Sequence, residues 1–261
     1  MTESTPRAAA GAMRVLRYAW RVPWLLLHVL VLLPLTVLLI SLPTARLRSG
    51  DGRLDDRLIR AWSAGLMRVF GFHLYRFGEP LHGATLFVAN HVSWSDIVLL
   101  HSQRMMGFVA KREIAGWPLV GWMATRGETI FHERGNTESL GGVMHEMLAR
   151  LRGGRAVGVF PEGRTRDGAE VGPFHARIFT PAVEAHAPVQ PVALCYGAHC
   201  SAQTVVAFHG REGFVGNFLR LLGEPARVAD VRFLEPIPAG SEEGRRRIAE
   251  LARERIVAAM Q

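Results

Sequence analysis

Residues 85–96 read TLFVANHVSWSD, and they join a mostly apolar run to a polar segment that holds His91 and Asp96. The apolar run predicts a buried strand, and the polar segment after it predicts a turn into a helix. Side chains on one helix face meet at spacings of three or four. The spacing of five therefore places His91 in the turn and Asp96 on the first turn of the helix, from which the carboxylate can reach back to the imidazole ring.

This pair has the chemistry of a general base. Imidazole titrates near neutral pH and can take a proton from an alcohol, while a carboxylate on its other ring nitrogen fixes the tautomer and stabilises the imidazolium. The sequence contains no Gly-x-Ser-x-Gly elbow, so a covalent serine intermediate has no support. A histidine and an aspartate also fall at this spacing by chance in many chains, and the assignment therefore depends on other segments.

Three further segments combine short apolar strands with proline or arginine at their ends. They are residues 127–135 (GETIFHERG), 159–168 (VFPEGRTRDG) and 189–194 (VQPVAL). In the second of them the strand breaks at proline and opens into a glycine-bounded turn that carries arginines, which suits an anionic ligand.

With these four segments in this order, the sequence resembles the glycerolipid acyltransferase family, which includes the 1-acylglycerol-3-phosphate acyltransferases. That family has the blocks NHxxxxD, Asp-Arg after a strand, FPEGT, and Pro-Val-aliphatic, and the resemblance spans about residues 85–194. It implies a membrane-bound O-acyltransferase that moves a fatty acyl group from acyl-CoA or acyl carrier protein to the free hydroxyl of a lysophospholipid. The favoured acceptor is 1-acyl-sn-glycerol-3-phosphate, with phosphatidic acid as product, and no metal or redox cofactor is implied.

Two blocks depart from the family pattern. His132-Glu133-Arg134 stands where the family usually has Ile-Asp-Arg, and Arg164 stands where it usually has threonine or serine. Because these blocks line the acceptor pocket in the family, an acceptor such as a lyso-aminolipid (lyso-ornithine lipid) stays open as the alternative. A membrane thioesterase or lysophospholipase, in which His91 activates water, and a non-catalytic membrane-binding module are the readings from other classes.

The candidate site combines the base pair with polar residues near the strand ends. Its members are His91 and Asp96 as catalytic residues, and Lys111, Arg134, Glu162, Gly163 and Arg164 as substrate-binding residues. We expect the arginines to hold an anionic head group, the amides near Gly163 to bind the oxyanion, and Glu162 to bond an acceptor hydroxyl or hold an arginine. Lys111 is the sole lysine in this arginine-rich chain, which suggests a phosphate contact, although chance survival explains it nearly as well.

Composition places the protein at a membrane. A net charge of +8 suits either nucleic acid or an anionic membrane, and the apolar content favours the membrane and argues against nucleic acid as a partner. The two cysteines exclude a disulfide framework, and both are expected to be small buried thiols. Their cluster with His199 lacks the remaining ligands of a zinc site. We expect a bacterial inner-membrane location with the catalytic domain facing the cytoplasm.

The membrane segment should precede the catalytic domain. Residues 24–42 (WLLLHVLVLLPLTVLLISL) are long enough to cross a bilayer, and arginines on both sides give no orientation. Residues 54–70 form an amphipathic pattern that indicates either an interfacial helix or a helix packed on the domain's own core. We therefore expect a disordered segment over residues 1–12 and a membrane anchor over residues 13–72. We expect this anchor to be a helical hairpin that lies in one leaflet, with its turn at residues 45–52.

Residues 73–261 should form an acyltransferase domain of the α/β class, with a mixed central sheet flanked by helices. The expected strands cover residues 73–77, 86–89, 107–110, 129–132, 156–160, 191–195, 205–209 and 228–234. The expected helices cover residues 95–103, 118–125, 137–151, 176–185, 214–222 and 241–259.

Overall fold

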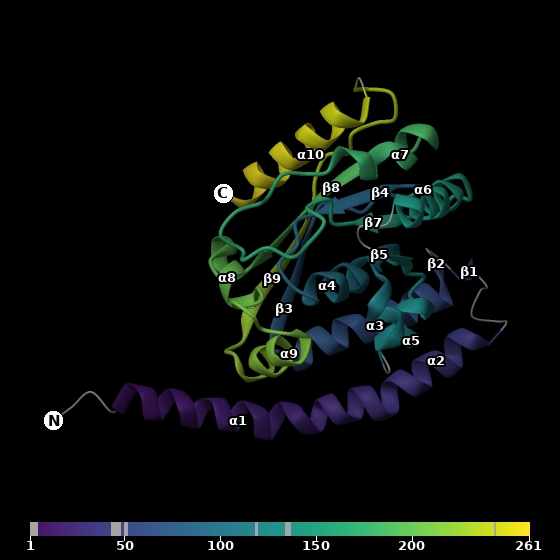
Figure 1. The fold of residues 1–261 in the computed structure, drawn as a ribbon. Helices are drawn as coiled ribbons and strands as arrows, with labels where there is room; N and C mark the ends of the chain where they lie inside the picture. Colours follow the sequence, from purple (N-terminus) through teal and green to yellow (C-terminus); the bar gives the residue numbers. More distant parts are fainter. Residues whose placement is uncertain (1–4, 43–47, 50–51, 118–119, 134–136, 243) are drawn as a thin grey trace.

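A mixed sheet forms the centre of the protein (Figure 1). The computed structural model describes residues 5–42, 48–49, 52–117, 120–133, 137–242 and 244–261. Within this part of the chain a seven-stranded sheet has the order β3-β9-β8-β4-β7-β5-β6. Its strands are β3 (Phe72–Phe77), β4 (Leu86–Ala89), β5 (Gly107–Lys111), β6 (Ile130–His132), β7 (Val157–Val159), β8 (Val189–Tyr196) and β9 (Arg227–Phe233). Outside this sheet, β1 (Arg48–Ser49) and β2 (Gly52–Arg53) pair with each other in antiparallel orientation.

The strand directions place several strand ends at one edge of the sheet. β8, β4, β7, β5 and β6 are parallel neighbours, whereas β9 is antiparallel to β8 and β3 is parallel to β9. The expected mixed α/β sheet is therefore confirmed. Loops after the parallel strands converge on the same edge, which is where open α/β sheets bind their ligands.

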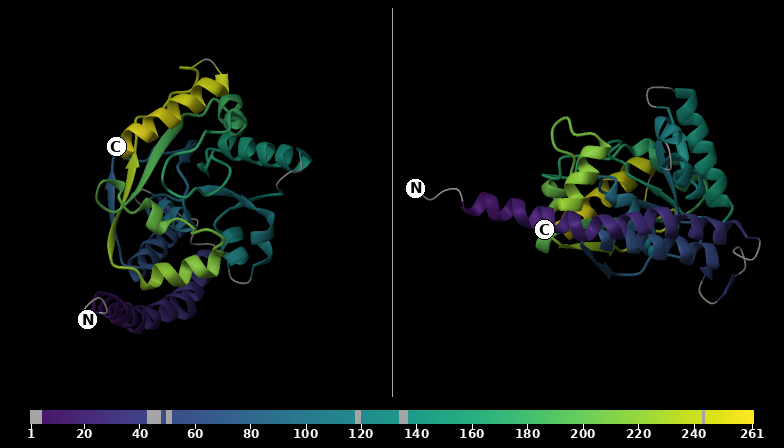
Figure 2. Two further views of the ribbon diagram at one scale, coloured as in Figure 1. Left: turned by 60° about the vertical axis from the view of Figure 1, so that its left-hand side comes forward. Right: turned by 90° about the horizontal axis from the view of Figure 1, so that it is seen from below.

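Helices cover both faces of the sheet (Figures 1 and 2). Leu86 and Val88 of β4 belong to one hydrophobic core cluster, and Phe87 and Ala89 belong to another, as expected for a strand buried on both sides. The first cluster includes residues of the helices on one face, α6 (Thr137–Arg152), α7 (Thr180–Glu184) and α10 (Gly244–Met260). The second includes residues of the helices on the other, α3 (Leu54–Val69), α4 (Ser95–Gln103) and α9 (Phe214–Gly223).

The apolar N-terminal segment is one continuous helix along the lower surface of the molecule (Figures 1 and 2). It consists of α1 (Thr5–Leu27), a π-helical turn (His28–Leu32) and α2 (Leu33–Ser41). His28 fastens it to α3, because its ring stacks on Trp62 at 5.0 Å and its Nε2 lies 2.8 Å from the Trp62 carbonyl oxygen. Gly65 permits this approach, since a Cβ there would lie 2.6 Å from the His28 ring.

The same helix also caps the end of α9. The Tyr18 hydroxyl donates to the Leu219 carbonyl at 2.8 Å, and the buried Arg21 donates to the carbonyls of Leu222 and Glu224 at 2.8 and 2.7 Å. The last carbonyls of a helix lack partners inside the helix and carry its negative dipole end, so a guanidinium satisfies both. The N-terminal helix is thus joined to α9 by specific hydrogen bonds.

Three sequence-based expectations about local structure are wrong. Residues 5–12, expected to be disordered, lie in α1, because the alanine-rich segment favours a helix. The predicted strand at 205–209 is instead a short helix, α8 (Gln203–Val206), with the residues after it outside any strand. This segment docks through the Gln203 side chain, which accepts from the Tyr196 amide and donates to the Leu194 carbonyl, and not through a strand ladder.

The third concerns the cysteines. Cys195 and Cys200 form a disulfide, because the turn after β8 passes through Gly197 at φ 76° and brings their Cα atoms to 4.5 Å. The hairpin expected in the anchor turns in a region that lies largely outside the described residues, with only 48–49 and 52 described. The helix before it is unbroken despite Pro34, which occupies an early position of α2.

An ion pair holds the segment between α8 and α9. The Glu212 carboxylate accepts from Arg220 at 2.9 and 3.0 Å and from the Asn217 amide at 3.1 Å. The hydrogen bonds from Arg220 are the main cause that lowers the pKa of Glu212 from 4.5 to about 2.

Glu212 should make the free energy of unfolding depend on pH in the acid range. A carboxylate whose pKa is depressed on folding stabilises the protein above its unfolded pKa, and this contribution is lost as the pH falls from about 4.5 to about 2. We expect Glu212→Gln to lower the free energy of unfolding at pH 7 and to have a smaller effect at pH 2.5, measured by urea denaturation in detergent. Exposed Glu184 is the matched control, as Glu184→Gln should change neither value. An effect of Glu212→Gln that is equal at both pH values would contradict the assignment.

Candidate active site

The His91–Asp96 pair forms as the spacing predicts. β4 ends at Ala89, α4 begins at Ser95, and the Asp96 Oδ2 atom lies 2.8 Å from His91 Nδ1. The same oxygen accepts the backbone amides of Val92 at 2.7 Å and Ser93 at 2.9 Å. The carboxylate is fully buried, so these donors replace the water that it would otherwise bind.

Asn90 fixes the start of this turn, a role that the sequence reading did not assign. Its side chain donates to the Leu194 carbonyl at 3.0 Å and accepts the Leu194 amide at 2.8 Å. The amide group therefore continues the pairing with β8 by one more residue, although the backbone has already left the strand. His91 follows directly, so its position is set by the register between β4 and β8.

The ring of His91 has a fixed plane and a free nitrogen. It stacks on Phe160 at 3.9 Å with 13° between the planes, and Phe160 stacks in turn on Phe108. Because Nδ1 donates to the carboxylate, the neutral ring carries its lone pair on Nε2. Nε2 makes no hydrogen bond to any residue that the structure describes, and 15% of the side chain is exposed. This nitrogen can therefore meet a substrate.

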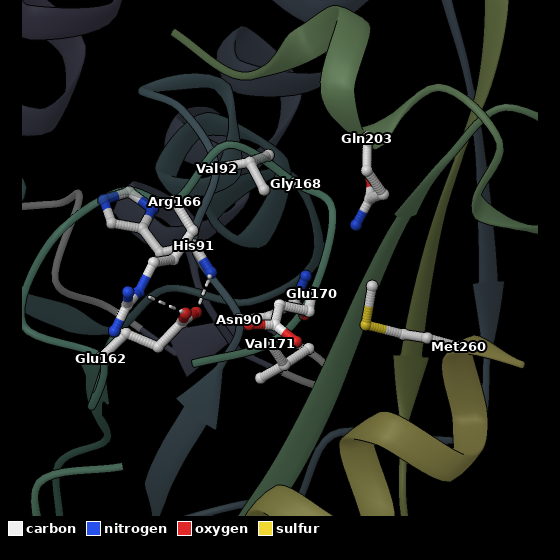
Figure 3. Close-up of a pocket in the computed structure, with 10 residues that line it drawn as sticks. All are labelled: Asn90, His91, Val92, Glu162, Arg166, Gly168, Glu170, Val171, Gln203 and Met260. Carbon is white, nitrogen blue, oxygen red and sulfur yellow. Dashed lines mark hydrogen bonds and ion pairs between the residues drawn. The ribbon is translucent and has the colours of Figure 1, made fainter. Parts of the chain in front are cut away.

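The FPEG segment (residues 160–163) and the turn after it hydrogen-bond the backbone of His91 at both its amide and its carbonyl. Glu162 is buried, and its Oε1 accepts the His91 amide at 2.9 Å, while the Arg166 amide donates to the His91 carbonyl at 2.8 Å (Figure 3). The other oxygen of Glu162, Oε2, accepts the Gly172 amide at 2.8 Å and lies 3.3 Å from Arg166 Nε. Burial raises the pKa of Glu162, and the two amide bonds and the nearby charges oppose that rise.

Glu162 thus holds Arg166, which is one of the two roles expected for it. It also fixes the loop of residues 90–94 that contains His91, here called the histidine loop. A cavity of only about 10 Å³ lies beside it, lined in part by Gln203 and Met260 (Figure 3). A cavity of this size has room for about one water molecule and no substrate. The exposed side of the His91 ring offers a substrate another approach.

Gly163 and Arg164 form the tip of the turn. Gly163 has φ 73°, a left-handed conformation that favours glycine, and its amide donates to the Phe160 carbonyl at 3.0 Å. That amide is occupied within the turn, so the Gly163 N–H itself is not free for an oxyanion in this structure. Arg164 is exposed and forms no ion pair with any described residue. Its guanidinium is exposed to solvent, and its role in binding an anionic ligand stays a prediction.

The other two predicted substrate contacts have different outcomes. Lys111 ends β5 and pairs with Glu113, with 2.8 Å between Nζ and Oε1. Both partners are largely exposed, and such surface pairs contribute little, so the lysine can exchange this partner for a phosphate. Arg134 lies outside the described residues. Their roles in binding stay predictions.

Tyr196 is a second residue of the site that the sequence reading missed. Its hydroxyl donates to Asp96 Oδ1 at 2.6 Å and lies 2.9 Å from Ser95 Oγ. Its position two residues after the last proline-marked strand segment was the one available signal. The described residues hold no cluster of three or more His, Cys, Asp or Glu that could bind a metal ion.

A fixed imidazole with a free Nε2, a buried carboxylate behind it and an arginine-bearing turn beside it define a hydroxyl-activating enzyme on a mixed α/β fold. Residues 75–195 match the family model named Acyltransferase. A lyso-ornithine lipid O-acyltransferase from Pseudomonas aeruginosa is 38% identical over 77% of this chain and 76% of that protein. A 1-acyl-sn-glycerol-3-phosphate acyltransferase from Neisseria gonorrhoeae is 30% identical over 76% and 80%. The chain therefore belongs to the acyltransferase family and is an O-acyltransferase.

A solved structure has the same fold. The crystal structure of the 1-acyl-sn-glycerophosphate (LPA) acyltransferase PlsC from Thermotoga maritima aligns with a TM-score of 0.72, covering 97% of this chain and 95% of that chain. The two sequences are 18% identical, so this match supports the fold alone.

Loss of the base should abolish most of the activity. We expect His91→Ala to lower kcat/KM for acyl transfer by about 10²–10⁴, because a positioned general base contributes about that factor. Asp96→Asn should also lower kcat, because an amide does not stabilise the imidazolium. Exposed His145 on α6 provides the control His145→Ala, which should match the wild type. Equal rates for His91→Ala and His145→Ala, with unchanged thermal unfolding, would contradict the role of His91.

Proposed function

We propose that the protein transfers a fatty acyl group from a thioester of coenzyme A or acyl carrier protein to the free hydroxyl of a lyso-ornithine lipid. The observation that carries the choice of acceptor is the 38% identity to the Pseudomonas aeruginosa enzyme of that name over three-quarters of both chains. The sequence alone favours 1-acyl-sn-glycerol-3-phosphate and leaves lyso-ornithine lipid as the alternative, and the identity reverses this order.

The site geometry supports a single-step transfer. His91 Nε2 removes the proton from the acceptor hydroxyl while the hydroxyl oxygen attacks the thioester carbonyl, and Asp96 stabilises the imidazolium that forms. When the carbon–sulfur bond breaks, the imidazolium returns its proton to the departing thiolate. An ester and a free thiol are the products, and no other cofactor is consumed.

Charged residues at the sheet edge suit an acceptor with both signs of charge. An acylated ornithine keeps a carboxylate and an ammonium group. Arg164 follows β7 and can bind the carboxylate, while the exposed Glu133 follows β6 and can bind the ammonium. β6 and β7 are separated by β5 in a parallel arrangement, so both residues follow the carboxyl ends of strands at the same edge.

A comparison of acceptors tests the proposal. The purified protein in detergent receives labelled palmitoyl-CoA, or palmitoyl acyl carrier protein, with lyso-ornithine lipid or lysophosphatidic acid at equal concentration. We expect kcat/KM for lyso-ornithine lipid to exceed that for lysophosphatidic acid at least about tenfold, a difference of about 1.4 kcal/mol in transition-state stabilisation.

The other outcomes separate the alternatives. Phosphatidic acid as the main product would overturn the proposed acceptor and leave the family assignment intact. Free fatty acid formed at the same rate without any acceptor would favour the thioesterase reading. His91→Ala in each reaction identifies product that does not come from this site.

We also propose that the protein binds a bilayer through the outer face of the N-terminal helix. Residues 11–41 are apolar and long enough to cross a membrane by length and composition. The helix lies along the domain, however, with Arg21 and His28 buried and Trp20, Leu30 and Leu38 exposed at 70%, 66% and 62%. This order is the reverse of a helix that faces water, and it suits a helix that lies in the membrane interface. The helix packs against α3, which carries the exposed arginines Arg60 and Arg68, and such residues suit anionic lipids.

One substitution on that face should weaken binding. We expect Leu30→Ser to lower the partition coefficient onto vesicles that contain phosphatidylglycerol by about tenfold, because burying a leucine contributes about 1.5–3 kcal/mol. Exposed Val183 lies on α7, away from the N-terminal helix (Figure 1), and Val183→Ser is the matched control. Flotation of both variants with vesicles measures the effect. Equal binding by both would contradict the assigned membrane face.

A further inference from the structure

Tyr196 comes from a different strand than the catalytic pair and meets it in the core. It is the last residue of β8, its side chain is fully buried, and its hydroxyl reaches Asp96 across a sequence separation of 100 residues. The chemistry proposed for the site uses the other oxygen of the carboxylate. Tyr196 therefore calls for its own explanation.

The two oxygens of Asp96 have different partners. Oδ2 accepts His91 Nδ1 and the amides of Val92 and Ser93. Oδ1 accepts the Tyr196 hydroxyl at 2.6 Å, a short bond of the charge-assisted kind. Because Asp96 has no exposed surface, bulk water does not reach Oδ1 if the hydroxyl is removed. The tyrosine thus fixes the rotation of the carboxylate and, with it, the direction of Oδ2 towards the imidazole.

The direction of the hydrogen bonds around Tyr196 follows from its single proton. The Asp96 carboxylate can only accept, so the tyrosine donates its proton there. Ser95 Oγ, at 2.9 Å, must then donate to the tyrosine oxygen, and Ser93 Oγ, at 2.7 Å from Ser95 Oγ, donates to Ser95. Bonds in such a chain polarise one another and strengthen the last donor. Burial and the Asp96 charge raise the pKa of Tyr196 well above 10, so it stays protonated.

The backbone of Tyr196 is held independently of its hydroxyl. Its amide donates to Gln203 Oε1 at 2.9 Å, and its carbonyl accepts the Ala202 amide at 2.7 Å. The Cys195–Cys200 disulfide closes the same turn. Removal of the hydroxyl alone should therefore leave the ring, which lies 5.5 Å from Phe72, in place.

We propose that Tyr196 is a positioning residue of acyl transfer, which holds the Asp96 carboxylate in the orientation that makes His91 an effective base. This inference rests on the role of the His91–Asp96 pair and is independent of which lysolipid is the acceptor. It also assigns Ser95 and Ser93 a function, namely to orient the tyrosine hydroxyl.

The test is Tyr196→Phe, assayed with the acceptor that the wild type acylates best. We expect kcat to fall about tenfold to a hundredfold, as is usual for loss of a residue that orients a catalytic group, with KM for the acceptor within about twofold. The acidic limb of the profile of kcat/KM against pH should move to higher pH. A carboxylate that has lost a donor attracts the imidazolium proton more strongly, and this raises the pKa of His91.

Two further variants separate positioning from general stability. Ser95→Ala keeps the tyrosine and removes only the donor behind it, so we expect a shift of the acidic limb in the same direction and of smaller size. Tyr75 of β3 is exposed, and Tyr75→Phe removes a hydroxyl without altering either kinetic constant. Thermal unfolding is recorded for each variant, and the titration of His91 is followed by NMR, which needs no substrate.

An unchanged kcat and an unchanged His91 titration in folded Tyr196→Phe would overturn the proposal. If Tyr196→Phe does not fold, the Ser95→Ala profile decides, and a wild-type profile there would overturn it as well. A wild type inactive towards lyso-ornithine lipid but active with another acceptor leaves this inference standing, because the His91 titration does not depend on the acceptor.

Discussion

The buried charge of Asp96 is the constraint on which the rest of the site depends. A carboxylate without access to water costs several kcal/mol unless donors replace the lost hydration. Here the donors come from the histidine ring, from two backbone amides of the turn and from a tyrosine on β8. Each of them offsets part of the cost of burying the charge. The orientation of the catalytic pair and the local stability of the turn therefore depend on the same hydrogen bonds.

Glu162 plays a parallel role one strand away. It accepts the His91 amide and the Gly172 amide, so one carboxylate joins the histidine loop to the loop that follows the FPEG segment. The Arg166 amide bonds the His91 carbonyl in return. Because β4 and β7 are parallel neighbours, the loops after them leave the same sheet edge and lie close enough to form these hydrogen bonds. Direct hydrogen bonds thus connect the NHxxxxD segment with the FPEG segment and the turn after it.

The sequence predicted what depends on local pattern and missed what depends on pairing between distant segments. The apolar run of β4 and the five-residue spacing gave the strand, the turn and the bounds of α4 correctly. Tyr196 could not be assigned in the same way, because its role follows from the register that places β8 beside β4. The strand expected at 205–209 failed for a related reason. Valines there match a strand pattern, yet the Gln203 side chain ties the segment to β8 as a helical turn.

Hydropathy alone could not predict how the N-terminal helix attaches to the rest of the protein. Apolar burial drives association only where the alternative is water, and lipid offers apolar groups no such penalty. A helix whose outer face lies in a membrane therefore needs another means of attachment to its domain. The contacts observed are of that kind, with Arg21 and Tyr18 bonding the last carbonyls of α9 and His28 stacked on Trp62. α9 also contacts the turn between His91 and Asp96. Its Phe218 packs on Trp94 of that turn, and its Asn217 accepts the Trp94 indole N–H at 3.0 Å. One helix, α9, consequently contacts both the N-terminal helix, for which we propose membrane binding, and the turn that holds His91 and Asp96.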